Sequence, residues 1–165
     1  MMAASPTRLS TPAPPRLALL EPDIAGNVGT LLRLSACLGV PIDLIEPLGF
    51  PFSDKKLARA GLDYADAALM RRHVDWAAFL AALPGRLVAI ETGAPTRLGT
   101  ATFLPGDTLL LGAESRGLPD WALARADLAV RLPMLAGRRS LNVAVAAAIA
   151  LGEALRQTQA WPAEV

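Results

Sequence analysis

The sequence predicts one α/β domain with a largely parallel sheet, and three observations lead to this class. The 165 residues, 53% of them hydrophobic and 19% charged, can enclose one core but leave little room for two. Short apolar runs alternate with segments of helical periodicity, as in βαβ units. Several of these runs end in polar loops that contain glycine. Because open α/β sheets bind ligands at the carboxyl ends of their strands, we expect a ligand site in those loops.

The first part of the chain predicts a strand, a helix and a second strand. Residues 16–20 form a short apolar run, and residues 42–45 form another. Between them, Asn27 is placed to cap a helix, and Gly39 is placed to end it in the left-handed conformation. A helix of this length can cross between parallel neighbours, so the chain should begin with a βαβ unit.

The middle of the chain predicts smaller elements. They are a basic helix over Asp54–Ala60 that Ser53 can cap, a strand over residues 67–70 and a helix over residues 75–83. The cations of the basic helix would share its exposed side. Such a group is usually a solvated face, but it could also hold phosphates.

The last third predicts the part of the sheet that should carry the site. Its strands cover residues 86–90, 108–111 and 128–132, and its helices cover residues 121–126 and 143–156. Pro133 should end the last strand, because proline has no N–H to give to a ladder. The final helix is apolar on nearly all sides, and Ser140 and Asn142 stand where capping side chains belong. This pattern is typical of a helix that is buried on most sides.

Composition and motifs exclude several kinds of site. The only histidine, His73, and the only cysteine, Cys37, do not supply the ligand set of a zinc site, and we predict no metal. No G-x-G-x-x-G follows the first strand and no phosphate-binding P-loop motif occurs, so dinucleotide and P-loop chemistry are not supported. The formal net charge is +1, so any polyanion must be held by local basic clusters.

The two ends of the chain bound the predicted domain. Residues 1–15 contain four prolines and predict a disordered tail, which leaves residues 16–160 as a single domain. The uncharged stretch over residues 140–152 is too short to span a bilayer, so we expect no membrane contact. A lone cysteine is compatible with a reducing cytoplasm, where we expect the protein to be located.

Two places in the pattern suggest a ligand, and each has a structural alternative. Gly137, Arg138 and Arg139 form a cationic loop at the start of the last helix, where free N–H groups favour anions. The alternative there is a capped core helix that follows a basic loop. Gly29 and Arg33 lie one turn apart on the first helix and could border one site, although a surface arginine is the commoner case.

Three segments, taken together and in order, resemble the motifs of the SpoU branch of the SPOUT class of RNA methyltransferases. They are Asn27-x-Gly29-x-x-x-Arg33, the run Leu111-Gly112-Ala113-Glu114-Ser115-Arg116-Gly117-Leu118, and Leu132-Pro133-Met134 with Ser140-Leu141-Asn142. Two further segments, residues 45–50 and 59–64, are similar to the subfamily that 2′-O-methylates the tRNA wobble nucleotide, cytidine or uridine 34. The resemblance covers residues 17–157.

The resemblance implies a Rossmann-like parallel sheet whose C-terminal segment is threaded into a deep trefoil knot, an exception to the usual rule for chain connections. It also implies that S-adenosyl-L-methionine binds in the loops after three strands. The cofactor-binding residues that it implies are Ile90, Gly112, Glu114, Leu132, Met134, Ser140 and Asn142. Gly112 would let the ligand approach closely, and backbone groups near Leu132 and Met134 would bind the adenine.

The same resemblance implies the catalytic residues. Methyl transfer to a ribose 2′-oxygen requires alignment of the two reactants and support for charge that develops on oxygen. Arg33 would orient the 2′-hydroxyl and stabilise this charge, since a guanidinium with a pKa above about 12 is a poor general base. Asn27 and Ser140 would hold Arg33 and the substrate in register, and the proton acceptor stays open.

The implied assembly is a homodimer in which Arg33 of one subunit faces the cofactor pocket of the other. The implied partner is tRNA, bound through its anticodon stem-loop. Two alternatives stay open. One is methylation of a ribosomal RNA ribose. The other is a catalytically weak, knotted RNA-binding protein, because Val143-Ala144 stands where relatives commonly carry a small polar pair.

Overall fold

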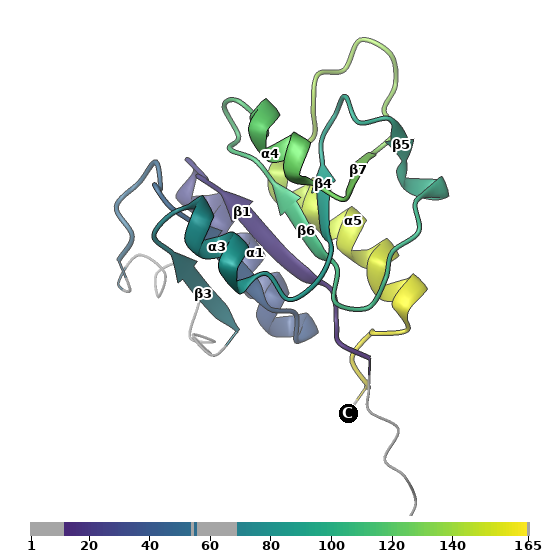
Figure 1. The fold of residues 1–165 in the computed structure, drawn as a ribbon, viewed down its shortest axis with the longest axis horizontal. Helices are drawn as coiled ribbons and strands as arrows, with labels where there is room; N and C mark the ends of the chain where they lie inside the picture. Colours follow the sequence, from purple (N-terminus) through teal and green to yellow (C-terminus); the bar gives the residue numbers. More distant parts are fainter. Residues whose placement is uncertain (1–11, 54, 56–68, 165) are drawn as a thin grey trace, which may run out of the picture.

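The computed structural model describes residues 12–53, 55 and 69–164. Seven strands form one sheet in the order β3-β2-β1-β6-β4-β7-β5, and all the pairs are parallel (Figure 1). The strands are β1 Arg16–Leu20, β2 Ile42–Ile45, β3 Met70–His73, β4 Leu87–Ile90, β5 Thr96–Arg97, β6 Thr108–Leu111 and β7 Leu128–Arg131. The predicted α/β class with a parallel sheet is confirmed.

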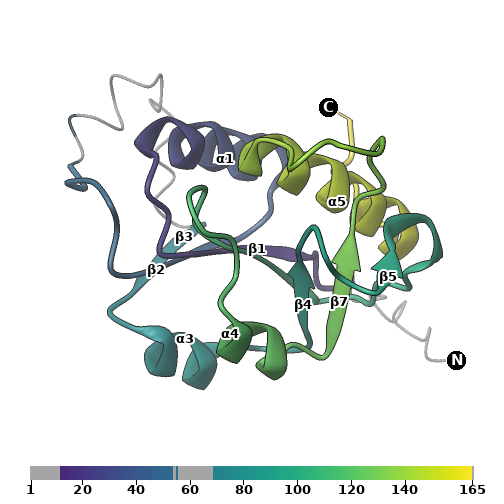
Figure 2. The same cartoon turned by 90° about the horizontal axis from the view of Figure 1, so that it is seen from above.

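Helices cover both faces of the sheet. On one face lie α1 (Ala25–Leu38) and α5 (Val143–Thr158), and on the other lie α3 (Trp76–Ala82) and α4 (Asp120–Arg125) (Figure 2). A short 3-10 helix, η1 (Leu98–Thr100), follows β5. Because both faces are covered, the four residues of β2, β4 and β6 are all buried, and this explains why these strands are continuous apolar runs.

The core has one cluster on each face. The larger cluster joins the sheet to α1 and α5, where small side chains such as Ala147, Ala150 and Ala154 are fully buried. Alanine at these positions lets α5 lie close to its neighbours, since no long side chain separates the backbones. The smaller cluster lies under α3 and α4 and is centred on Phe79.

Several predicted boundaries are corrected. The strand expected over residues 67–70 is β3, Met70–His73, which is an edge strand with Arg71 and Arg72 exposed. An edge strand can carry exposed cations, so an apolar pattern could not locate it. The short strand β5, at the other edge, was expected to be loop. The predicted basic helix over Asp54–Ala60 falls outside the described residues, apart from Lys55.

The ends of the chain are only partly described. Residues 1–11 of the predicted tail lie outside the described range. Residues 12–15 precede β1, and the carbonyl of Ala13 accepts a hydrogen bond from the N–H of Gly106 at 3.0 Å, so the last residues of the predicted tail contact the domain. In the described part of the chain, no helix is long and apolar enough to cross a membrane. The single domain over residues 16–160 and the trefoil knot stay predictions.

Candidate active site

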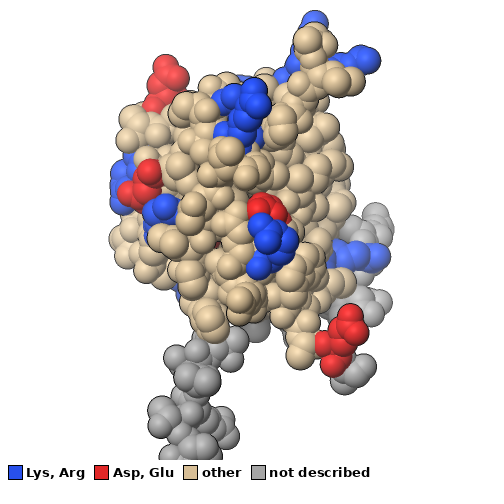
Figure 3. Space-filling view, turned by 90° about the vertical axis from the view of Figure 1, so that its right-hand side faces the viewer, with Lys and Arg blue, Asp and Glu red and all other residues tan. Residues whose placement is uncertain are grey.

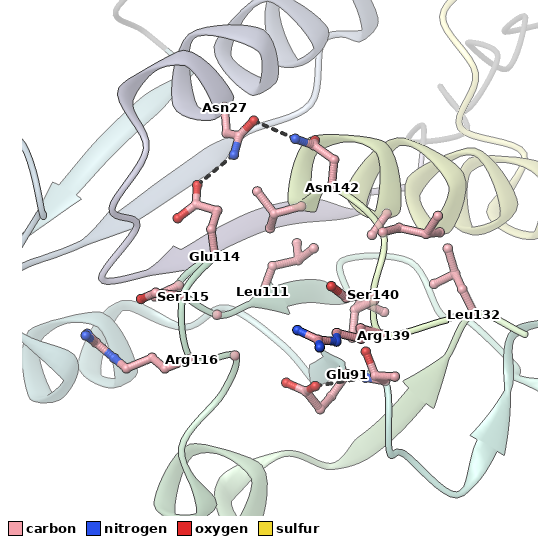
Figure 4. Close-up of a pocket in the computed structure, with 18 of the residues that line it drawn as sticks. Asn27, Glu91, Leu111, Glu114, Ser115, Arg116, Leu132, Arg139, Ser140 and Asn142 are labelled. Atoms are coloured by element: carbon pink, nitrogen blue, oxygen red, sulfur yellow. Dashed lines mark hydrogen bonds between the residues drawn. The ribbon is translucent and has the colours of Figure 1, made fainter. Parts of the chain in front are cut away.

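A cavity of about 580 Å³ lies at the carboxyl ends of β4, β6 and β7, beside the first turns of α1 and α5 (Figure 4). This is the edge at which the sequence predicted a ligand site. Eight of the nine predicted site residues line the cavity: Asn27, Ile90, Gly112, Glu114, Leu132, Met134, Ser140 and Asn142. Their individual roles stay predictions. The fold therefore brings three segments that are far apart in the sequence into one cavity.

A chain of hydrogen bonds connects the three segments. Glu114, in the loop after β6, accepts a bond from the side-chain amide of Asn27 at 3.0 Å. The Asn27 amide oxygen accepts a bond from the Asn142 side-chain amide at 2.9 Å. The Asn142 oxygen then accepts bonds from the N–H groups of Ala144 and Val145 at the start of α5. Figure 4 shows Asn27 bonded to Glu114 on one side and to Asn142 on the other.

Chemistry fixes the direction of every bond in this chain. An ionised carboxylate only accepts, so the Asn27 NH₂ group must face Glu114. The Asn27 oxygen is then available only to a donor, which is the NH₂ group of Asn142. The Asn142 oxygen is left for the helix N–H groups that need an acceptor. One carboxylate therefore sets the orientation of the cap of α5.

The predictions that Asn27 and Asn142 cap helices have different outcomes. Asn142 is the N-cap of α5, as expected. Asn27 is not the N-cap of α1, because that helix begins at Ala25 and Ile24 occupies the cap position without a side-chain cap bond. The Asn27 side chain binds Glu114 and Asn142 instead. A tertiary contact with residues far along the chain therefore replaces the local one that the pattern suggested.

The loop after β6 itself requires a glycine at position 112, a requirement that the sequence did not predict. A Cβ atom built on Gly112 would lie 2.2 Å from the carbonyl carbon of Gly117 and 2.5 Å from the nitrogen of Leu118. The glycine therefore allows the loop after β6 to fold back on itself, whatever ligand fills the cavity. Ala113 and Gly117 form a bridge across this loop, and Gly117 has a φ of +67°. A larger side chain at Gly112 would disrupt the loop before it could block a ligand.

Arg33 is the one predicted site residue that is not among the described residues lining the cavity. It lies on α1 and is exposed. The cavity of a single chain therefore contains two of the three predicted catalytic residues, Asn27 and Ser140, but not Arg33.

Both signs of charge occur in the cavity wall. Glu91 and Glu114 are its carboxylates, and Arg116 and Arg139 are its cations. Arg116 donates to Glu21, so part of its charge is balanced outside the cavity. Among the described residues, no group of three or more His, Cys, Asp or Glu side chains is placed to hold a metal ion.

Asp23 lies behind Glu114 at the edge of this site. Its backbone N–H donates to Glu114 at 2.9 Å, and its carboxylate accepts a bond from the Ser115 hydroxyl. The pKa of Asp23 is lowered by its neighbours Glu114 and Ser115, and of the two side chains the Ser115 hydroxyl is the one that donates a hydrogen bond to its carboxylate. The start of α1 is therefore held to the loop after β6 by several polar contacts.

The sequence prediction missed Glu91. This residue directly follows β4 and lines the cavity, and its carboxylate accepts bonds from the N–H groups of Thr92 and Leu118, both at 2.9 Å. It belongs to none of the three motifs. Its position immediately after a buried strand was the only signal that could have identified it.

The cavity fits the cofactor that the resemblance implies. Its volume is within the range of small-molecule sites, about 300–1,000 Å³. Ile90, Leu111, Leu132 and Val143 give an apolar wall suited to an adenine ring, and the charged and polar side chains supply partners for a ribose and an amino acid.

Comparison with known proteins agrees with this geometry. Residues 14–152 match the model of the SpoU rRNA Methylase family. The chain is 52% identical over 147 residues to a protein from Beijerinckia indica named tRNA (cytidine(34)-2′-O)-methyltransferase, a match that covers 87% of this chain and 92% of the relative. It is 48% identical over 146 residues to a protein of the same name from Ancylobacter novellus, covering 86% and 92%.

Two solved structures are also similar. One, described as structural insights into the 2-OH methylation of C/U34 on tRNA, has 46% identity and a TM-score of 0.83, and the match covers 90% of this chain and 98% of the other. The other is an AdoMet-bound rRNA methyltransferase from Sinorhizobium meliloti, with 27% identity and a TM-score of 0.78, covering 88% and 57%. Since the family model spans all three motifs that meet in the cavity, this chain belongs to the SpoU rRNA methylase family.

Proposed function

We propose that this protein transfers a methyl group from S-adenosyl-L-methionine to the ribose 2′-hydroxyl of nucleotide 34 of tRNA, cytidine or uridine. The main support is the identity of 52% over 87% of the chain to a relative named for this reaction on cytidine 34. The eight predicted site residues that meet in one cavity add to this support. We propose the cytoplasm as the place of action, together with its tRNA substrate.

The cofactor would supply a methyl group on a positively charged sulfur, so the protein needs neither a metal nor a covalent intermediate. The task of its residues is to hold the two reactants in line and to support charge on the attacking oxygen. The chain from Glu114 through Asn27 to Asn142 fixes the first turns of α1 and α5 beside the cavity. Ser140 lies at the same end of the cavity, where it would contact the cofactor or the incoming ribose.

Arg33 would act across a subunit interface. It projects from α1, and α1 lies next to α5 on one face of the sheet (Figure 2). The same region exposes apolar side chains on α5, with Val145 48% and Ile149 44% accessible. A second copy of the chain that covers this surface would bury them and carry Arg33 toward the partner's cavity. The composite homodimer site is thus a proposal that also explains why Arg33 does not line its own cavity.

The tRNA would be held by separate basic groups. Arg71, Arg138 and Arg139 are exposed. Figure 3 shows one face on which Lys and Arg side chains stand in separate groups, some of them beside Asp or Glu side chains. Such groups suit a folded RNA whose phosphates reach the protein at several points, through contacts that salt weakens. We propose the anticodon stem-loop as the bound part, because nucleotide 34 lies in it.

The direct test is mass spectrometry of tRNA nucleosides from a strain that lacks the protein. The 2′-O-methyl mark at nucleotide 34 should disappear, and it should return with the wild-type gene but not with Arg33→Ala. Arg33→Ala should still bind S-adenosylmethionine within a few-fold of wild type, because Arg33 would face the nucleotide. Persistence of the mark in the deletion strain would refute the proposed function.

The composite site has its own test. Ala146 lines the cavity from α5, so Ala146→Phe should fill the cofactor space and inactivate the protein. This variant is preferable to Gly112→Val, which would break the loop after β6. If Arg33→Ala and Ala146→Phe chains are refolded together, half of the dimers are mixed and about a quarter of all sites receive two intact components. Partial recovery of activity is expected. No recovery in heterodimers verified by native mass spectrometry would show that each site is built within one chain.

A further inference from the structure

Glu91 is a carboxylate in the cavity that no sequence motif includes. It follows β4 directly, and its own backbone N–H donates to the carbonyl of Val130 at 3.0 Å, which extends the pairing of β4 with β7. In Figure 4 its side chain lies below Arg139 and Ser140, at the base of the view. It therefore occupies the end of a central strand, on the opposite side of the cavity from Asn27.

The Glu91 carboxylate is held rigidly. One oxygen accepts from the N–H of Thr92 and the other from the N–H of Leu118, both at 2.9 Å. It also lies against the backbone of the loop after β6, since a Cβ atom on Gly117 would be 2.9 Å from it. A group held by two backbone donors needs little reorganisation when a ligand arrives.

This carboxylate has acceptor capacity left over. A carboxylate offers about four lone-pair sites, two on each oxygen. Among the described residues, the N–H groups of Thr92 and Leu118 are its only bonding partners, one on each oxygen. One further acceptor site remains on each oxygen. Two adjacent acceptors match two adjacent donors, and the vicinal hydroxyls of a ribose provide that pair.

We propose that Glu91 binds the 2′- and 3′-hydroxyls of the cofactor ribose and so selects a ribonucleoside ligand. This inference rests on the proposed function for the identity of the cofactor. The apolar wall next to Glu91 starts at Ile90, which would place an adenine beside it. An acidic side chain that accepts from ribose hydroxyls is also the solution used by dinucleotide-binding α/β domains.

The other carboxylate of the cavity, Glu114, is a poorer candidate. It accepts from the backbone N–H of Asp23 on one oxygen and from the Asn27 side chain on the other. Its bonds are directed toward α1, and its role is to orient the chain that ends at Asn142. Glu91 does not orient other side chains in this way. Among the described residues it bonds the backbone N–H groups of Thr92 and Leu118.

Glutamine cannot replace glutamate here. In the Glu91→Gln variant the side chain would have one oxygen and one NH₂ group in place of two oxygens, so its NH₂ group would face the N–H of either Thr92 or Leu118. At least one of those bonds would be lost, and one ribose hydroxyl would lose its acceptor. Loss of binding alone therefore cannot separate a direct role of Glu91 from a role in supporting the loop.

A binding cycle separates the two roles. Calorimetry would measure the affinity of wild type and Glu91→Gln for S-adenosylhomocysteine and for its 2′-deoxy and 3′-deoxy analogues. Wild type should lose roughly tenfold for each missing hydroxyl, because each bond is made to a charged acceptor. Glu91→Gln should bind the parent ligand at least tenfold more weakly and should discriminate less between the parent and one or both deoxy analogues. Glu46→Gln, which changes a carboxylate that binds Arg72 outside the cavity, is the matched control and should behave like wild type.

Each other outcome overturns the inference. If Glu91→Gln still loses the full factor for both missing hydroxyls, Glu91 only supports the loop. If wild type binds all three ligands equally, the ribose hydroxyls are not recognised, and this result holds even where the variant does not fold. If the variant binds 5′-methylthioadenosine as well as wild type does, the partner of Glu91 is the amino-acid ammonium group. Failure of wild type to bind S-adenosylhomocysteine at all would instead refute the proposed function, and this inference with it.

Discussion

Two carboxylates, Glu114 and Asp43, each contact one partner through each oxygen, and they organise two different parts of this molecule. Glu114 lies at the cavity and orients two asparagine side chains. Asp43 lies on β2 and accepts from Arg16 at 2.7 Å, and its other oxygen lies 2.7 Å from a ring nitrogen of His73. Each carboxylate thus joins parts of the chain that are far apart in sequence. The first cluster borders a cavity that a ligand can enter, whereas the second lies beneath α3, where Phe79 packs edge-on against His73.

The two carboxylates differ in how deeply they and their partners are buried. The side chains of Asp43 and His73 are only 4% and 5% exposed, so every polar atom there must find its partner within the protein. Not every polar atom finds one, since Nε of Arg16 is buried without a partner among the described residues. The Glu114 cluster is partly exposed and consists mostly of neutral amides whose direction matters more than their charge. We therefore expect Asp43 to control stability and Glu114 to control the site.

Asp43→Ala should produce the largest effect on folding. It would leave His73 and Arg16 without their buried partner, which typically costs about 3–5 kcal/mol of unfolding free energy and lowers Tm by about 10 °C. Urea unfolding measures the change, and the affinity of the folded fraction for S-adenosylmethionine should stay as in wild type. Asp75→Ala is the matched control, since Asp75 is an exposed N-cap with one bond to Ala78 and should cost about 1 kcal/mol. Similar losses in the two variants would contradict the importance given to burial.

Glu114→Gln should show the reverse division. The new NH₂ group would face either the Asp23 N–H, whose bond would then be lost, or the Asn27 amide, in which case Asn27 and then Asn142 would be driven to turn over. We expect methyl transfer to fall by roughly tenfold or more, with a stability loss of only about 1–2 kcal/mol. Single-turnover methylation of tRNA and urea unfolding would be measured on the same preparation. An unchanged rate with a large loss of stability would reverse the roles assigned to the two carboxylates.

The sequence predicted the bounds of the buried strands better than those of the edge strand or the contacts between strands. β1, β2 and β6 have the bounds that the apolar runs predicted, because buried strands of a parallel sheet must be apolar on both sides. β3 was misplaced by three residues because it is an edge strand with exposed arginines. No pattern could connect Asp43 to His73, since neither belongs to a motif and their contact depends on how two strands pair.

The candidate site shows the same limit. The family resemblance brought together eight residues that line the cavity. The capping role suggested for Asn27 was local, and the structure gives its side chain tertiary contacts instead. The close packing of Gly112 against Gly117 within one loop was not predicted. Glu91 escaped prediction because a single carboxylate after a strand is not a distinctive signal. Contacts between loops are set by how the strands are ordered, and the order β1-β6-β4-β7 could not be obtained from periodicity.

Asn142→Asp should separate the helix cap from the hydrogen-bond chain that passes through it. Aspartate caps a helix as well as asparagine does, so the bonds from Ala144 and Val145 should persist with little change in stability. Aspartate has no NH₂ group, so the bond to the Asn27 oxygen would be lost. We expect a several-fold loss of methyl transfer at nearly constant Tm. Asn142→Ala, which loses both functions, should also lower stability by about 1 kcal/mol, and equal stability of the two variants would argue against the capping role.

A third carboxylate, Glu153, should contribute least to stability, so its replacement has the smallest expected effect. It accepts from Arg156 one turn along α5 and from Gln157, and the bond from Arg156 is the main reason that its pKa is lowered to about 2 from an ordinary 4.5. A carboxyl group whose pKa is lower in the folded state stabilises the fold fully above pH 4.5, and this contribution is lost as the pH falls toward 2.

Because the Arg156 side chain is 68% exposed, water and salt screen the pair, and Glu153→Gln should lower Tm at pH 7 by only about 1 °C or less. The small difference between wild type and variant should shrink between pH 4.5 and 2 and also in 1 M salt, where the Debye length is about 3 Å. Thermal unfolding across this pH range measures it. A loss as large as that of Asp43→Ala would mean that contact geometry, rather than burial, decides how much a carboxylate contributes.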